Sequence, residues 1–236
     1  MRLNKFLARA GVSSRRKCDI LIELGKVKIN GHIERNYSYQ VVRDDIVICN
    51  GEAIDALPKR KVYLVNKLKG YISTSSDPQN RKCVIDLVSC SDRLFTIGRL
   101  DRDTTGAIVV TNDGELANYL MHPKNKIERV YIVASKLDIS LEGQSQLTKG
   151  IELDDGSRVK GKLQRLDKSG GLIYWRVVLK EGKNHEVKRI FKSLGSRVIH
   201  LHRHSFAGFN VDNISPGKYH ILKDKDIQKL MKKNPL

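Results

Sequence analysis

Residues 98–123 read GRLDRDTTGAIVVTNDGELANYLMHP, and this stretch carries the strongest signal for the fold. It opens with glycines and small polar residues, which suit a turn, and then passes abruptly into the β-branched run GAIVV, which predicts a buried strand. Helical spacing follows and stops at Pro123. We therefore expect a turn, a strand and a helix in immediate succession.

The turn has an uneven charge arrangement, because Asp101 lies between Arg99 and Arg102. Neighbouring cations favour the ionised form of a carboxyl group. Such a carboxylate is either part of a structural ion pair or a catalytic group, and structural pairs on loops are the more common case. The stretch alone leaves both interpretations open, and the rest of the sequence has to separate them.

The composition indicates a globular protein with a polyanionic partner. The 236 residues are 40% hydrophobic and 30% charged, and 44 Lys and Arg against 26 Asp and Glu give a net charge of +18. This charge favours nucleic acid, and no apolar run approaches the roughly 20 residues that span a bilayer. The N-terminal sequence lacks the apolar core of a secretion signal. We expect a cytoplasmic protein that contacts no membrane and has reduced cysteines; these are Cys18, Cys49, Cys83 and Cys90.

The N-terminal part predicts two short helices followed by strands. Residues 2–10 carry apolar side chains at helical spacing, and Ser13 or Ser14 is placed to cap a second helix that ends at Gly25. The sequence KVKINGHIE predicts a hairpin, because Asn-Gly is favoured in a tight two-residue turn. DDIVICNGEAI predicts another strand and turn.

Cations gather on both of these helices. The first helix carries them in a stripe beside its apolar face, and the second begins with three of them, where they oppose the helix dipole at a cost of about 0.3 to 1 kcal/mol each. This placement is unfavourable for stability but suits phosphate contacts, so we expect these residues to bind RNA. They are Arg2, Lys5, Arg9, Arg15, Arg16 and Lys17.

The two basic helices and the strands after them resemble the S4 RNA-binding domain. The match lies in RLNKFLARAGVSSRR and GKVKINGHI and covers residues 1 to about 55. The following sequence DALPKRK holds a proline among charges, which is typical of a linker. We place the S4-like domain at residues 1–57, a linker at 58–61 and a second domain at 62–236.

Beyond the linker the pattern changes to short strands, glycine turns and a few helices. Runs such as VYLVNK, ERVYIVAS, LIYWRVVLK and RVIHLHRHSF predict strands, whereas GELANYLMHP and HEVKRIFKSLG predict helices. Strands and helices do not alternate regularly, which favours the α+β class. The expected architecture of this part is a mixed, mainly antiparallel β-sheet with flanking helices.

Sequence motifs for common cofactors are missing from the chain. It contains neither GxxxxGK[ST] nor a GxGxxG that opens a helix, so we expect no nucleotide or nicotinamide cofactor. His200, His202 and His204 alternate along a predicted strand and would face one side. No carboxylate or thiol accompanies them and Arg203 adds repulsive charge, so we expect a basic strand face that contacts RNA rather than a metal site.

Five segments match a known family in order. GRLDRDTTGAIVVTNDGELANYLMHP resembles the catalytic motif of the RsuA/RluB-type ribosomal RNA pseudouridine synthases. VNKLKGYISTSSDP, KIERVYIV, LKEGKNHEVKRIFKSLG and VIHLHRHSFAG resemble the opening segment, the tyrosine-bearing strand, the basic helix and the closing strand of that family. A preceding S4 domain is also the family arrangement, so the resemblance covers nearly the whole chain.

The resemblance implies roles for individual residues. Asp101 corresponds to the catalytic aspartate, Tyr131 to the aromatic residue that stacks on a flipped uracil, and Lys188 to the basic partner of the aspartate. Without it, Tyr131 would equally be a core tyrosine and Lys188 a surface lysine. Isomerisation breaks the N-glycosidic bond and joins C5 to C1′, which needs a carboxylate, at C1′ or at the 2′ proton, and no redox cofactor. The implied substrate-binding residues are Arg99, Leu201 and Arg203.

Three positions depart from the family pattern. Leu68 replaces a proline, GAIVV replaces a leucine-rich run, and Glu186 stands where many relatives have glutamine. None of these changes removes a proposed catalytic group.

We therefore expect an rRNA pseudouridine synthase that needs no cofactor or metal and acts as a monomer on ribosomal RNA or a pre-ribosomal particle. DGELANYLMHP and EGKNHEV favour large-subunit RNA, with small-subunit RNA next. Two other classes are open. A non-catalytic RNA-binding ribosome assembly factor could share this fold, although the presence of Asp101, Tyr131 and Lys188 counts against it. A DNA-binding regulator would suit the charge, but the sequence has no DNA-reading motif.

Overall fold

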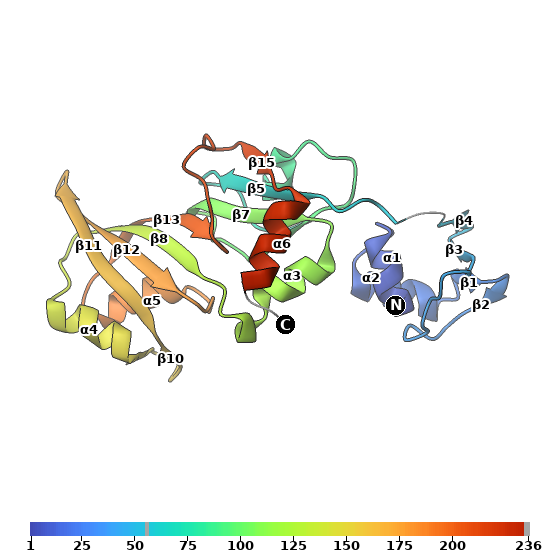
Figure 1. Cartoon of the computed structure of the whole chain (residues 1–236), viewed down its shortest axis with the longest axis horizontal. Helices are drawn as coiled ribbons and strands as arrows, with labels where there is room; N and C mark the ends of the chain where they lie inside the picture. The colour runs from blue at the N-terminus through green and yellow to red at the C-terminus, as the bar shows by residue number, and fades with distance from the viewer. Residues whose placement is uncertain (55–56, 234–236) are drawn as a thin grey trace. The chain divides into compact units, whose positions relative to one another are not determined.

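The chain folds into two compact units, each built from helices and strands (Figure 1). The computed structural model describes residues 1–54 and 57–233. The first unit contains residues 1–61 with two short segments, 90–93 and 112–114, and the second contains the rest of the described chain. Residues 55 and 56 of the predicted linker sequence lie outside the described residues. The division between residues 57 and 58 stays a prediction.

The first unit begins with two helices and continues as a small antiparallel sheet with the strand order β2-β1-β3-β4. Its elements are α1 (Leu3–Arg9), α2 (Arg15–Glu23), β1 (Val27–Ile29), β2 (His32–Ile33), β3 (Val47–Cys49) and β4 (Glu52–Ala53). The cap predicted for α2 is Ser14, whose Oγ accepts a hydrogen bond from the backbone N–H of Lys17 at 3.3 Å. The predicted hairpin is confirmed, since Asn30 and Gly31 both have positive φ in the turn between β1 and β2.

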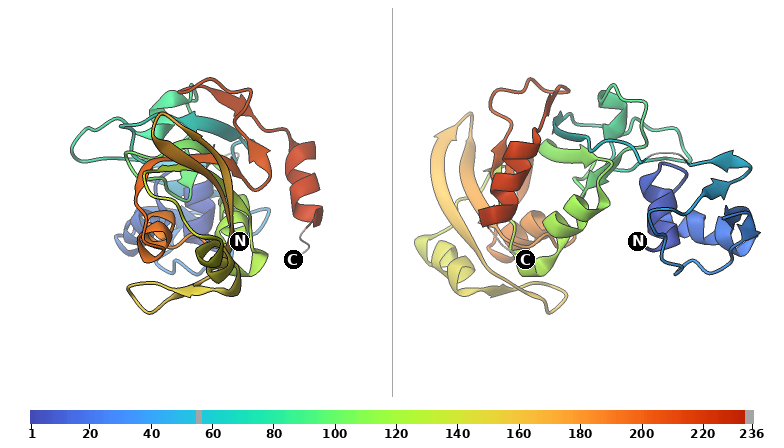
Figure 2. Two further views of the ribbon diagram at one scale, coloured as in Figure 1. Left: turned by 90° about the vertical axis from the view of Figure 1, so that its left-hand side faces the viewer. Right: turned by 45° about the vertical axis from the view of Figure 1, so that its right-hand side comes forward.

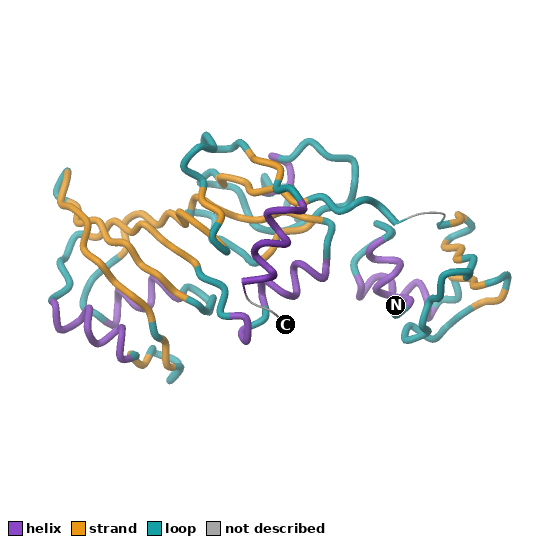
Figure 3. The backbone as a smooth tube through the Cα atoms, in the orientation of Figure 1, coloured by secondary structure: helices purple, strands orange, loops and turns teal. Residues whose placement is uncertain are grey.

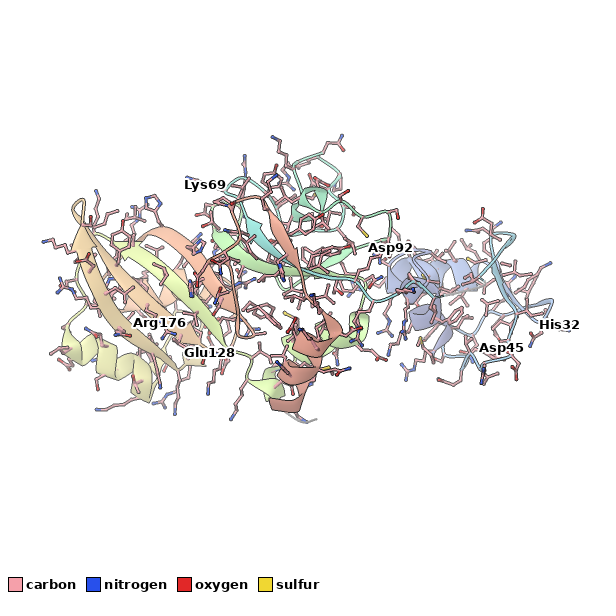
Figure 4. The ribbon with its side chains drawn as sticks, turned by 45° about the horizontal axis from the view of Figure 1, so that its top comes forward. His32, Asp45, Lys69, Asp92, Glu128 and Arg176 are labelled. Atoms are coloured by element: carbon pink, nitrogen blue, oxygen red, sulfur yellow. The ribbon has the colours of Figure 1, made fainter. Side chains whose placement is uncertain are left out.

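Apolar side chains of both helices form the core of this unit. Leu3 and Leu7 of α1 and Cys18 and Ile22 of α2 are fully buried against Val27 and neighbouring strand residues. Asp45, labelled in Figure 4, fixes the loop before β3 by accepting hydrogen bonds from the side chain of Asn30 and the backbone of Val42. The predicted RNA-binding cations stay outside the core. Arg2, Arg9, Arg15, Arg16 and Lys17 are exposed, and Lys5 is half-buried.

The last residues of the predicted linker are held by hydrogen bonds. The Asn112 side chain donates to the carbonyl oxygen of Lys59 at 2.8 Å and accepts from the backbone N–H of Lys61, also at 2.8 Å. The ammonium group of Lys61 forms an ion pair with Asp92 at 2.9 Å. Residues 59–61 therefore have a defined conformation beside the segments 90–93 and 112–114 of the same unit.

A sheet with the strand order β11-β12-β8-β13-β7-β5-β15 dominates the second unit, and β14 and β6 extend it beside β13 and β7. Figure 3 draws the strands in orange. Its strands are β5 (Val62–Lys67), β6 (Phe95–Ile97), β7 (Thr105–Thr111), β8 (Arg129–Ser135), β11 (Gly161–Ser169), β12 (Leu172–Leu179), β13 (Val198–Phe206), β14 (Phe209–Asn210) and β15 (Tyr219–Ile221). Only the pairing of β13 with β7 is parallel among the described strands. This confirms the predicted α+β class with a mixed, mainly antiparallel sheet. A separate hairpin joins β9 (Ile151–Glu152) and β10 (Arg158–Val159).

Helices cover the sheet in two groups, which Figures 1 and 2 show. The elements are α3 (Gly114–Met121), α4 (Leu141–Lys149), α5 (Glu186–Ser193), α6 (Asp224–Lys233) and the short 3-10 turns Val84–Leu87 and Pro123–Asn125. Leu116 of α3 and Ile227 of α6 pack with Leu64 and Val109 of the sheet. Phe191 of α5 packs edge-on against Trp175 of β12, with ring centroids 6.4 Å apart. Within the described residues, no helix has the length and apolar character needed to cross a membrane.

The parallel pairing of β7 and β13 depends on one glycine. Gly106 lies opposite Arg203 in the pairing and has φ of +102°. A Cβ atom at this position would lie 2.2 Å from the carbonyl oxygen of Arg203, a distance at which the two strands could not stay in place. Only glycine allows this approach, and the approach sets the register of the two strands that frame the pocket described below.

Replacing Gly106 with alanine should destabilise the protein by about 3 kcal/mol or more, because the new methyl group meets backbone and φ is unfavourable. Gly208→Ala is the matched control, since Gly208 also has a positive φ, +82°, but has no atom within 4 Å of a built Cβ. The control should cost only about 1 kcal/mol. Denaturant unfolding followed by circular dichroism measures both variants, and equal losses would contradict the close-contact argument.

Candidate active site

A pocket of about 90 Å³ opens where the loop before β7 meets β8, β13 and the start of α5. All six residues predicted to act on or bind the substrate line it, although they come from distant parts of the chain. They are Arg99, Asp101, Tyr131, Lys188, Leu201 and Arg203. A wider depression of about 690 Å³ adjoins the pocket and shares Asp101 and His185 with it. The structure therefore brings the predicted site together.

Asp101 is the carboxylate at the mouth of the pocket, and Lys188 holds it. The Lys188 ammonium donates to Asp101 Oδ2 at 3.0 Å and to both oxygens of Asp103, at 3.2 and 3.1 Å. Burial alone would lower the pKa of Lys188, but the two carboxylates outweigh burial and raise it above the ordinary lysine value. Lys188 is therefore a cation shared between two carboxylates, and Asp103 is a partner that the sequence did not suggest.

His185 approaches the other oxygen of Asp101. Its Nε2 lies 3.4 Å from Asp101 Oδ1, and its backbone, at the start of α5, adopts the left-handed conformation with φ of 50°. That conformation is uncommon for a histidine and often marks a functional site. His185 lies in the family-like stretch EGKNHEV, but nothing in that stretch predicts this backbone conformation or the approach to Asp101.

Lys67 holds the loop before β7 in place through hydrogen bonds to its backbone. Its side chain is 1% exposed, and its ammonium donates to the carbonyl oxygens of Asp101 at 3.0 Å and Thr104 at 2.6 Å, with longer contacts to those of Leu68 and Arg102. Burial lowers the pKa of Lys67 to about 8. A lysine that ends the apolar run VYLVNK is the sequence signal that could have identified this anchor.

Tyr131 and Leu201 supply the apolar side of the pocket. Tyr131 lies on β8 opposite Arg203 of β13, and Leu201 lies opposite Val133. Tyr131 is buried and Leu201 is half-buried, and both line the pocket. Tyr131 is therefore part of the core and of the pocket wall at once, so the two interpretations left open by the sequence do not exclude each other.

Arg203, predicted to bind the substrate, is buried in the sheet opposite Tyr131. It is 3% exposed, its Nε donates to the carbonyl oxygen of Ala107 at 2.6 Å, and its guanidinium lies 4.9 Å from the ring centre of Phe206. Arg129, also buried, lies 5.3 Å from the same ring, and burial lowers its pKa. The sequence did not identify Arg129. Arg99, by contrast, is exposed at the rim.

The three alternating histidines have separate surroundings. His202 bonds to Thr105 Oγ1 at 2.9 Å, His204 lies 3.2 Å from Asp212, and His200 is exposed. A register shift between Arg203 and Ser205 in the pairing of β13 with β8 interrupts the predicted alternation before His204, whereas His200 and His202 stay in one register. Across residues 1–54 and 57–233, no cluster of three or more His, Cys, Asp or Glu residues is arranged to hold a metal ion.

Comparisons with known proteins agree with this geometry. The family model described as RNA pseudouridylate synthase matches residues 61–193, and the S4 domain model matches residues 1–47. The chain is similar in fold to a solved structure described as a pseudouridylate synthase, with a TM-score of 0.70, 27% identity, and coverage of 98% of this chain and 99% of that one.

Curated relatives extend over almost the full length of the chain. The ribosomal large subunit pseudouridine synthase B of Bacillus subtilis (strain 168) is 37% identical, over 97% of this chain and 95% of the relative. An uncharacterized RNA pseudouridine synthase of Aquifex aeolicus (strain VF5) is 34% identical, over 98% of this chain and 94% of that relative. The chain belongs to the RNA pseudouridylate synthase family and carries an S4 domain at its N-terminal end.

Proposed function

We propose that this protein converts a specific uridine of ribosomal RNA into pseudouridine, with Asp101 as the catalytic carboxylate. The observation that carries the proposal is the placement of Asp101, which Lys188 holds at 3.0 Å at the mouth of a pocket walled by Tyr131 and Leu201. A paired, partly exposed carboxylate beside a pocket with an aromatic and an apolar side chain in its wall suits chemistry on a nucleoside. A purely structural ion pair would not require such a space next to it.

The reaction requires the target uridine to leave its helix and enter the pocket. The base then packs against Tyr131 and Leu201, which supply an aromatic and an apolar surface for it. Breaking the bond between N1 and C1′ leaves its electron pair on the uracil. In one route Asp101 attacks C1′ as the uracil leaves, and C5 of the rotated uracil then displaces the carboxylate from C1′. In the other route Asp101 removes the C2′ proton as the uracil leaves and returns it when C5 bonds to C1′. In both routes the proton on C5 is then lost and N1 gains a proton, so the product is an isomer of the substrate. Nothing is oxidised or reduced, so no redox cofactor is needed.

Lys188 and Asp103 keep the carboxylate ready for this step. Lys188 contacts Oδ2 of Asp101, whereas among the described residues Oδ1 has only the longer contact with His185. The less engaged oxygen, Oδ1, is the one available to the sugar. Asp103 accepts hydrogen bonds from the same ammonium through both of its oxygens. The charge of Lys188 is therefore shared between Asp103 and Asp101.

Two observations support an rRNA substrate: the positive charge of the chain and the names of its relatives. A net charge of +18 and the exposed cations of the first unit suit a structured RNA. The Bacillus relative is named for the large ribosomal subunit, so large-subunit rRNA is the first substrate to test and small-subunit rRNA the second. We further propose that the enzyme acts as a cytoplasmic monomer on rRNA or a pre-ribosomal particle.

Asp101→Asn should abolish pseudouridine formation while leaving RNA affinity within a few fold, because phosphate contacts elsewhere dominate binding. The measurement incubates purified protein with rRNA, without added cofactor, and maps pseudouridine by chemical modification and primer extension. Asp167→Asn, on the exposed strand β11, is the control and should keep full activity. Undiminished turnover by Asp101→Asn would refute its assignment, and a wild-type protein that binds RNA without modifying it would favour an assembly factor.

The rate should fall above about pH 8, the pKa of Lys67, because the neutral amine donates fewer hydrogen bonds to the catalytic loop. Single-turnover rates from pH 6 to 9.5 measure this dependence. Lys67→Met should be about 10- to 100-fold slower and lack this decline, since three or four bonds to carbonyls are lost. The side chain introduced by Lys188→Arg does not titrate in this range, so this variant should still lose rate above about pH 8. If its rate instead stays level to pH 9.5 while the wild-type rate falls, the loss of rate comes from Lys188 and not from Lys67.

Replacing Arg15, Arg16 and Lys17 with glutamine should weaken RNA binding and make it less sensitive to salt. If all three contact phosphates, the slope of log affinity against log salt should drop in magnitude by about 2 to 3. Single-turnover rates at saturating protein should change little, because these cations lie outside the pocket. A matched triple change at exposed Lys223, Lys225 and Lys229 is the control. An equal effect in the control would show general charge attraction instead of a binding site on α2.

A further inference from the structure

The wall of the pocket contains a buried hydrogen-bond donor that has no acceptor. Arg203 is 3% exposed and uses its Nε to bond Ala107, but its Nη2 is fully buried and unpartnered among the described residues. The Oγ1 of Thr104, which is 1% exposed, is likewise buried and without a partner there. Both residues line the pocket. Unsatisfied buried polar atoms are costly and rare, so two in one pocket indicate groups that a ligand completes.

The charge around these atoms is also unbalanced. Within residues 1–54 and 57–233, no carboxylate forms an ion pair with Arg203 or with the buried Arg129. Glu186 is the buried carboxyl group of the pocket; burial raises its pKa, and it forms no ion pair with either arginine among the described residues. The Asp101 charge is already shared with Lys188. The pocket therefore presents buried positive charge that would favour a ligand with developing negative charge.

The proposed reaction generates such a charge inside the pocket. When the bond between N1 and C1′ breaks, both electrons stay with the uracil, and its negative charge spreads over N1, O2 and O4. This holds whether Asp101 attacks C1′ or removes the 2′ proton. A guanidinium N–H fixed in a water-poor pocket stabilises an oxygen on which charge develops, without reorganisation during the reaction.

We propose that Arg203 is a further catalytic residue, whose Nη2 donates to a carbonyl oxygen of the flipped uracil and stabilises the anion formed on glycosidic cleavage. The Thr104 hydroxyl is the second contact and can accept from N3–H or donate to a carbonyl. If the contact is with O4, the same arrangement selects uracil over cytosine, whose 4-amino group is a donor and would face the donor of Arg203. This inference rests on the proposed function.

The test replaces single atoms of the substrate. Three target RNAs carry uridine, 2-thiouridine or 4-thiouridine at the modified position, and single-turnover rates are measured for each. Sulfur accepts hydrogen bonds weakly but stabilises a negative charge well, so a thio-substrate should react faster unless a protein contact to that atom is lost. The wild-type enzyme should process one of the two thio-RNAs about 10-fold or more slowly than the uridine RNA.

Arg203→Lys keeps the charge but loses the directed N–H, so its rate with uridine RNA should fall about 100-fold or more. The rates of this variant on the uridine RNA and on the slow thio-RNA should lie within threefold of each other, because the contact to that atom is already missing. Thr104→Val preserves shape and should slow the uridine reaction about 10-fold. Arg176→Lys, on the exposed side of β12 and labelled in Figure 4, is the matched control and should behave as wild type.

Equal wild-type rates on all three RNAs would overturn the proposal, and this comparison needs no variant that has to fold. A folded Arg203→Lys enzyme with normal turnover of uridine would overturn it as well. Failure of the proposed function looks different, because the wild-type protein would then form no pseudouridine in the uridine RNA.

Discussion

The buried ammonium of Lys67 is the interaction on which the site depends. It draws the carbonyl oxygens of Asp101 and Thr104 toward one point beneath the loop, so the backbone of that loop curls around a cation. With its carbonyls turned inward, the loop presents the Asp101 side chain to the pocket, where Lys188 meets it. Burying a lysine is costly, as its pKa of about 8 shows, and the carbonyl contacts offset that cost only while the loop keeps this shape.

Close contact between β7 and β13 gives the loop its neighbours. Gly106 lets β7 lie directly against the backbone of Arg203, in the parallel pair of the sheet. The residues just before β7 therefore lie beside Leu201 and Arg203, and the antiparallel pairing of β13 with β8 adds Tyr131. The walls that come from the loop before β7, from β8 and from β13 thus follow from the order of three adjacent strands, and a shift in register would move all three.

Local signals in the sequence predicted the local features of the fold. The Asn30-Gly31 turn, the Ser14 cap and the end of α3 before Pro123 each depend on residues a few positions apart, and the structure contains all three. The grouping of Asp101, Tyr131 and Lys188 came from resemblance to a family, because no local rule relates them. Lys67, Asp103 and the buried Arg203 were harder to predict. Where their polar groups point depends on backbone carbonyls and carboxylates that only the folded sheet brings near.

The cations in and beside the pocket differ in how completely they are paired, and this difference separates their roles. Lys188 is held by two carboxylates, so it positions Asp101 and has little capacity left for an incoming anion. Lys67 donates its hydrogen bonds to backbone carbonyl oxygens of the loop and is buried beneath it, so it does not line the pocket. Arg203 alone keeps a buried donor without a partner among these three. A site that splits a neutral nucleoside into an electrophilic sugar and an anionic base needs both kinds of group. One kind keeps a carboxylate in place for the sugar, and the other stays unsatisfied until the base becomes charged.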